Sequence, residues 1–125
     1  MAEIDLGTVR NTGHWSPIPL DLSDLAAVHD LTTATFLVEV RPELGSTIKL
    51  MQWRTGGSLI TLSNSIVYDN TEKTLALEAP STGLLAAFPT GGDFFWEVGF
   101  FLASAPTDLR VIGYGPFPVI DGVIR

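Results

Sequence analysis

Hydrophobic and polar side chains alternate most clearly in residues 34–41, Ala-Thr-Phe-Leu-Val-Glu-Val-Arg. The even positions from Phe36 to Val40 are apolar, whereas Glu39 and Arg41 stand among the odd ones. Successive side chains of a strand point to opposite faces, so this pattern predicts a strand with one face in the core and one facing outward.

Residues 93–103 form the longest stretch with strand character, and Glu97 is its only charged residue after Asp93. Both faces are otherwise apolar, which is typical of a strand covered on both sides or pressed against a neighbour. From the two stretches together we expect these core residues: Phe36, Val38, Val40, Phe94, Trp96, Val98 and Phe100.

Turn-forming residues recur at short intervals between further β-rich segments. We predict strands at 47–53, 58–62, 65–68, 74–77, 109–114 and 117–120. Short strands separated by frequent Gly, Pro, Asn and Asp residues are the signature of a sandwich or barrel. The sequence therefore predicts an all-β fold, an antiparallel β-sandwich, with residues 1–125 as a single domain.

Two local features refine this picture. Pro116 and Pro118 cannot donate to a strand ladder, so the last segment is expected at a sheet edge. Helix is expected only as short turns at 21–28 and 81–88, the second capped by Ser81 or Thr82.

Composition excludes several classes of protein. Hydrophobic residues make up 46% of the 125 and charged residues only 17%, which excludes disorder and leaves more apolar surface than a monomer needs. The net charge is −7 and the sequence has no cluster of basic residues, so no nucleic-acid partner is expected. The absence of cysteine excludes thiolate chemistry and disulfides. We expect no secretion signal and no membrane partner, because the first residues lack a basic and apolar leader and residues 94–103 are too short to span a bilayer as a helix.

The residues that carry chemistry form no recognised catalytic or metal-binding motif. His14 and His29 have no Gly-x-Ser-x-Gly elbow to pair with, so they are interpreted as ordinary histidines. Asp21, Asp24 and Asp30 match no calcium loop, although a loose Ca²⁺ site there stays open beside their interpretation as loop or capping residues. We therefore assign no catalytic residue, no cofactor and no metal, and expect the protein not to be an enzyme.

Two pairs of interpretations remain for the other notable side chains. Glu39 and Glu97 would suit glycoside hydrolysis if their strands were neighbours, but the preferred interpretation places both on outward faces, paired with Arg41, Arg110 or solvent. Aromatic residues could form a sugar-stacking platform or belong to the core. Trp15 and Trp53 stand beside turns and are the better candidates for exposure, together with Tyr114.

Both ends of the chain carry motifs in a recognisable order. These are residues 5–10 (Asp-Leu-Gly-Thr-Val-Arg), Trp15 and 31–41, and later 90–98 (Thr-Gly-Gly-Asp-Phe-Phe-Trp-Glu-Val), 113–120 (Gly-Tyr-Gly-Pro-Phe-Pro-Val-Ile) and 121–125 (Asp-Gly-Val-Ile-Arg). The chain resembles the small immunoglobulin-like structural proteins of tailed bacteriophages, including the N-terminal domain of baseplate upper proteins. It departs from their pattern at Thr33, Phe94 and Ile124, where the family usually has Gly, Tyr and Thr.

The resemblance implies an immunoglobulin-like sandwich that serves as a non-enzymatic virion component, made in the host bacterial cytoplasm. Its expected role is a tail, baseplate or neck adaptor that docks to other virion proteins and to copies of itself. A head-decoration protein and a carbohydrate-binding module are the alternatives. Residues 1–12 are expected to form an N-terminal arm that docks on a neighbour or packs on its own domain. The expected interface residues are Ile4, Leu6, Val9, Trp15, Phe117, Val119 and Ile120.

Overall fold

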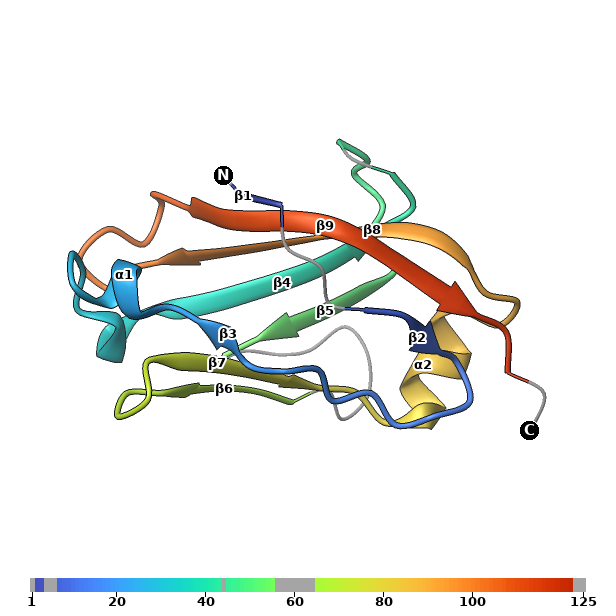
Figure 1. Ribbon diagram of the computed structural model, residues 1–125. Helices are drawn as coiled ribbons and strands as arrows, with labels where there is room; N and C mark the ends of the chain where they lie inside the picture. Colours follow the sequence, from blue (N-terminus) through green and yellow to red (C-terminus); the bar gives the residue numbers. More distant parts are fainter. Residues whose placement is uncertain (1, 4–6, 44, 56–64, 123–125) are drawn as a thin grey trace.

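The computed structural model describes residues 2–3, 7–43, 45–55 and 65–122. Two β-sheets lie face to face with a hydrophobic core between them, and short helical segments close the two ends (Figure 1). The expected all-β fold is confirmed, because helix in the described residues is limited to α1 (Ser23–Ala26), the 3₁₀ turn η1 (Leu31–Thr33) and α2 (Ser81–Ala87).

The larger sheet has six strands, with β1, β9, β8, β4 and β5 in that spatial order and β2 pairing with β9 as well. Its strands are β1 (Ala2–Glu3), β2 (Val9–Arg10), β4 (Thr35–Arg41), β5 (Met51–Arg54), β8 (Gly92–Phe101) and β9 (Arg110–Ile120). The pairs among β5, β4, β8 and β9 are antiparallel, whereas β1 and β2 run parallel to β9.

The smaller sheet has three strands in the order β3, β7, β6, all antiparallel. These are β3 (Leu20–Asp21), β7 (Thr74–Glu78) and β6 (Ser65–Asp69). Trp53 of the larger sheet donates its indole N–H to the carbonyl oxygen of Glu78 in the smaller one, at 2.9 Å. This bond ties the two layers together through the core.

Alternation decides which face of each strand is buried. Phe36, Val38 and Val40 are at most 1% exposed, as are Trp96 and Phe100 on β8. The predicted core is therefore confirmed, with one difference: Phe94, near the start of β8, is only partly buried against it.

Two strand predictions differ from the structure, and a third cannot be compared with it. The strand expected at 47–53 begins only at Met51, and before it the Arg41 guanidinium donates to the carbonyl oxygen of Ser46. The strands expected at 109–114 and 117–120 are one continuous strand, β9. The strand expected at 58–62 lies outside the described residues.

The expected edge position of the last strand is wrong, because the N-terminal segment pairs with β9 on the side away from β8. The carbonyl oxygen of Ile120 accepts from the N–H of Asn11 at 3.2 Å. Alternate residues of a strand direct their backbone groups to the same side, so the even-numbered residues in this part of β9 direct theirs toward the N-terminal segment. Pro116 and Pro118 lie between the residues paired with β1 and those paired with β2. Their missing N–H groups therefore interrupt neither short ladder.

The short helical turns occur where they were expected, but one cap was predicted incorrectly. Pro80 is the N-cap of α2 and makes no side-chain capping bond, and Ser81 is already the first helical residue. Proline suits the start of a helix because its fixed φ and missing N–H cost nothing there.

Candidate functional site

The residues expected at an interface lie mostly inside the domain. Val9, Phe117 and Val119 are 0%, 1% and 6% exposed, whereas Ile120 is 46% exposed. Ile4 and Leu6 lie outside the described residues. The described part of the N-terminal arm thus packs on its own domain, which was the competing interpretation, and this corrects the exposure expected at Val9, Phe117 and Val119.

Of the two interpretations of the aromatic residues, core or exposed platform, the core holds for Trp15 and Trp53. Trp15 is 7% exposed and Trp53 is fully buried. The two rings pack 5.7 Å apart, and Trp15 meets Phe117 edge to face at 5.3 Å. The backbone of Trp15 bridges to Ala79, which holds the ring over the core instead of at the surface. The sugar-stacking platform that included these rings is therefore not formed.

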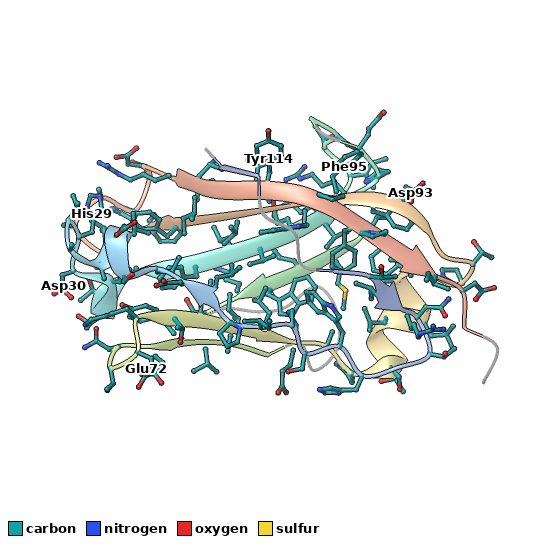
Figure 2. The ribbon with its side chains drawn as sticks, in the orientation of Figure 1. His29, Asp30, Glu72, Asp93, Phe95 and Tyr114 are labelled. Atoms are coloured by element: carbon teal, nitrogen blue, oxygen red, sulfur yellow. The ribbon has the colours of Figure 1, made fainter. Side chains whose placement is uncertain are left out.

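The histidines and the acidic turn residues have local roles. His14 is exposed, 3.7 Å from the Glu78 carboxylate, and the ring of His29 packs 5.7 Å from that of Phe100. Asp21 accepts from the backbone N–H of Ser23, and this hydrogen bond lowers the pKa of its carboxyl group. Figure 2 shows His29 and Asp30 beside α1 at one end of the sandwich.

Asp30, like Asp21, accepts a hydrogen bond from the backbone N–H two residues later in the chain. It caps η1 by accepting from the hydroxyl and the N–H of Thr32, and these bonds lower its pKa. Asp30 is thus the N-cap of η1, whereas Asp21 ends β3 and accepts from the first residue of α1, whose N-cap is Leu22. Within the described part of the chain, no group of three or more histidine or carboxylate side chains could hold a metal ion.

The outward side of the larger sheet brings together the side chains that the sequence left unplaced. We call this surface the outer face. Tyr114 projects there from β9, away from the smaller sheet, and Phe95 lies on the same side (Figure 2). The outer face comprises Thr35, Leu37, Glu39, Arg41, Gln52, Arg54, Asp93, Phe95, Glu97, Gly99, Phe101, Val111 and Tyr114.

Glu39 and Glu97 are directly opposite each other on β4 and β8. Cβ atoms of such a pair are about 4.5–5.5 Å apart, so two like charges meet at the centre of the outer face. Glu39 is compensated: it pairs with Arg41, and its other oxygen accepts from Lys49 at 2.9 Å and Gln52 at 2.8 Å. The expected pairing with Arg41 is confirmed, whereas Arg110 pairs with Asp108 instead.

Burial acts to raise the pKa of Glu39, but the hydrogen bonds and charges of Lys49 and Arg41 outweigh it, so that the pKa lies below its usual value. A glycosidase acid needs the opposite change, a raised pKa that keeps its proton near neutral pH. Nothing in the environment of Glu39 therefore favours the hydrolytic interpretation of the two glutamates.

A groove of about 380 Å³ runs over this region of the outer face. Its lining combines the two glutamates with three cationic side chains and an apolar wall: Leu37, Glu39, Arg41, Lys49, Gln52, Arg54, Glu97, Gly99, Leu109 and Val111. The register of β8 and β9 shifts between Val98 and Gly99, and Gly99 leaves the floor without a side chain. A Cβ at Gly99 would lie 2.9 Å from the carbonyl oxygen of Arg110, so the close approach of β9 requires glycine here.

Two charged groups of the groove have no ion-pair partner within 4 Å among the described residues. Glu97 makes no ion pair there, and Arg54 only lies over the ring of Phe101, with 5.8 Å from its Cζ atom to the ring centre. This cluster of side chains was not predicted from the sequence, since Lys49 and Gln52 were interpreted only as parts of the strand at 47–53 and Arg54 was not singled out. The alternation of Gln52 and Arg54 with Met51 and Trp53 was the signal that could have found it.

The ion pairs of Glu39 predict how stability responds to acid. A lowered pKa means that the folded state favours the carboxylate, so its contribution is complete above the reference value of 4.5 and is lost as the pH falls through the folded-state pKa. We expect Glu39→Gln to cost about 1 kcal/mol at pH 7, measured by urea unfolding, and much less at the lowest pH at which the domain stays folded. Glu72→Gln, at an exposed turn, is the control. A cost for Glu39→Gln that does not change with pH would contradict the prediction.

No helix in the described residues combines the length and the apolar character needed to cross a bilayer. A scan against protein-family models found no match to this chain. A search of curated proteins likewise found no relative.

Proposed function

We propose that this protein is a non-enzymatic assembly domain with an immunoglobulin-like sandwich fold, and that it docks to other proteins through the outer face. The observation that carries the proposal is the uncovered state of that face. Among the described residues, no second layer lies over it, although the smaller sheet and the helical ends cover the other side (Figure 1).

The composition of the outer face supports a protein partner. Leu109 and Val111 are 54% and 40% exposed and line the groove together with Leu37. Phe101 and Tyr114 lie on the same face. Exposed apolar side chains that form a contiguous patch with polar groups around them mark interaction surfaces. Tyr and Arg, which are enriched at interfaces, both occur on this face.

The setting we propose is the virion of a tailed bacteriophage, with the chain as a tail, baseplate or neck adaptor. This part of the proposal is supported by the resemblance of the two ends of the chain to small phage structural proteins. In the structure β1 and β2 both pair in parallel with β9, so the two ends of the chain lie side by side. The partners would be other virion proteins and further copies of this chain.

Two valine variants test docking through the outer face. Val111→Asp adds a charge on the outer face, and Val67→Asp adds the same charge at a 56% exposed position of β6 in the smaller sheet. The chain would be expressed with the structural proteins encoded beside it, and its amount in purified particles measured by mass spectrometry.

We expect Val111→Asp to reduce incorporation at least about tenfold, because a buried unpaired charge costs several kcal/mol at an interface. Val67→Asp should leave incorporation unchanged, and both variants should melt close to the parent. Equal incorporation of the two variants would contradict docking through the outer face. Absence of the parent chain from the particles would contradict the virion setting.

A further inference from the structure

The outer face is close to neutral in a strongly acidic chain. Of the seven Lys and Arg residues, Arg41, Lys49 and Arg54 line the groove, together with only two of the fourteen acidic residues. Elsewhere acidic residues predominate, because the whole chain carries a net charge of −7. Two copies of the chain would repel each other least if they met through this face.

The charges that line the groove are also divided into a paired and an unpaired set. Glu39 is ion-paired with both Arg41 and Lys49 within the chain. Arg54 on β5 and Glu97 on β8 remain, opposite in sign and without ion-pair partners in the described part of the chain. The strand between them, β4, contributes Leu37, and Gly99 of β8 leaves a hollow beside it.

We infer that the outer face pairs with the outer face of a second copy of this chain, in a two-fold dimer held by Arg54 of each copy against Glu97 of the other. The inference rests on the proposed function and names one partner for the docking face. A two-fold interface brings a patch against an identical patch, so it must complement itself. One unpaired cation and one unpaired anion at separate positions meet this requirement.

The geometry of the pairing follows from the order of the strands. Arg54 and Glu97 lie on either side of β4, two residues apart along the strands, because Arg54 is opposite Leu37 and Glu97 is opposite Glu39. A two-fold axis in the plane of the face, midway between Arg54 and Glu97, exchanges their positions and forms two equivalent ion pairs. The same rotation turns Leu37 of each copy toward the hollow above Gly99 of the other.

Charge reversal at the two positions tests this arrangement. Sedimentation velocity of the full chain, up to about 1 mM, should show the parent in a monomer–dimer equilibrium. Arg54→Glu alone and Glu97→Arg alone should each weaken dimerisation at least about tenfold, because each variant places like charges together twice. An equimolar mixture of the two single variants should associate again, since both contacts in the mixed dimer then join a carboxylate to a guanidinium.

Arg110→Glu is the matched control. It changes the net charge by as much as Arg54→Glu does, at an exposed residue whose partner is Asp108 on its own chain. Dimerisation should change little in this variant, which separates the specific pairing from general repulsion between acidic chains. Salt is less informative, because it screens that repulsion and the ion pairs together.

Each outcome decides between the inference and its alternatives. A parent chain that stays monomeric at about 1 mM, single variants that dimerise like the parent, or a mixture that does not associate would each overturn the two-fold pairing. If the parent is monomeric while Val111→Asp still loses incorporation into particles, the outer face docks on a different protein. In that case the proposed function stands and only the dimer fails.

Discussion

Replacing Phe100 with alanine is expected to lower the free energy of unfolding by about 3–5 kcal/mol. Phe100 is 1% exposed near the end of β8, directly opposite Phe36, with 6.2 Å between the ring centres. The ring of His29 also packs against it, at 5.7 Å. Removing the ring therefore leaves a cavity that rigid strands cannot close. A loss of this size is a large fraction of the 5–15 kcal/mol that stabilises a typical domain.

The next residue provides the matched control. Phe101 has the same side chain on the same strand, but it lies on the outer face, is only partly buried and has Arg54 above its ring. Phe101→Ala should cost no more than about 1–2 kcal/mol, mainly from lost surface burial. Urea unfolding of both variants measures the difference. Equal losses would show that the two faces of β8 have been assigned incorrectly.

This contrast between neighbours shows what the sequence determines well. Alternation alone identified the buried face of β4 and most of that of β8, because a strand has only two sides and Phe36, Val38 and Val40 share one. The same pattern placed Glu39 and Arg41 together on the opposite side, where they form an ion pair. Local periodicity was sufficient for both results.

Contacts between distant segments were not visible in the same way. Trp15 and Trp53 stand beside turns, yet both are buried because segments 38 residues apart in the sequence pack ring against ring. The groove depends on the register of β8 against β9, including the shift at Gly99. Its unpaired charges are Arg54 on β5 and Glu97 on β8, two strands that are far apart in the sequence and pair with opposite sides of β4. No local pattern contains this information.

The N-terminal segment gives the clearest case of a long-range contact that the sequence concealed. Asn11 looked like part of an ordinary Asn-Thr-Gly turn, but it is fully buried. Its side-chain amide donates to the carbonyl oxygen of Phe88 at 2.8 Å and to Asp121 at 2.9 Å, and its oxygen accepts from the N–H of Gly122 at 2.8 Å. One side chain thus joins the N-terminal segment, the end of α2 and the residues after β9.

The segments that meet around Asn11 are tightly packed against one another. A Cβ at Gly122 would lie 1.8 Å from the side-chain oxygen of Thr12, so the Thr12 side chain packs directly on the backbone of Gly122. At Gly91, which has a φ of +75°, a Cβ would lie 2.7 Å from the carbonyl oxygen of Val119. If the Asn11 side chain is removed, neither water nor a movement of the chain can easily replace its hydrogen bonds in such a tightly packed corner.

Asn11→Ala is therefore expected to cost about 3 kcal/mol, because the Phe88 carbonyl and the Gly122 N–H each lose a partner while still buried. Asn70→Ala is the matched control: Asn70 lies in the exposed turn after β6, its side chain accepts only from Lys73, and its loss should cost well under 1 kcal/mol. Urea unfolding gives both values.

Asn11→Asp separates hydrogen bonding from shape. It keeps the size of the side chain and the acceptor for Gly122, but it removes both donated bonds and sets a carboxylate against Asp121. We expect a loss at pH 7 at least as large as that of Asn11→Ala, and a partial recovery on acidification, because the raised pKa of the new carboxyl group favours its protonated form in the folded state. If Asn11→Ala unfolded within a few tenths of a kcal/mol of the parent, the N-terminal segment would not be fixed to its own domain by this residue. Its docking on a neighbouring molecule would then become the better interpretation of residues 1–12.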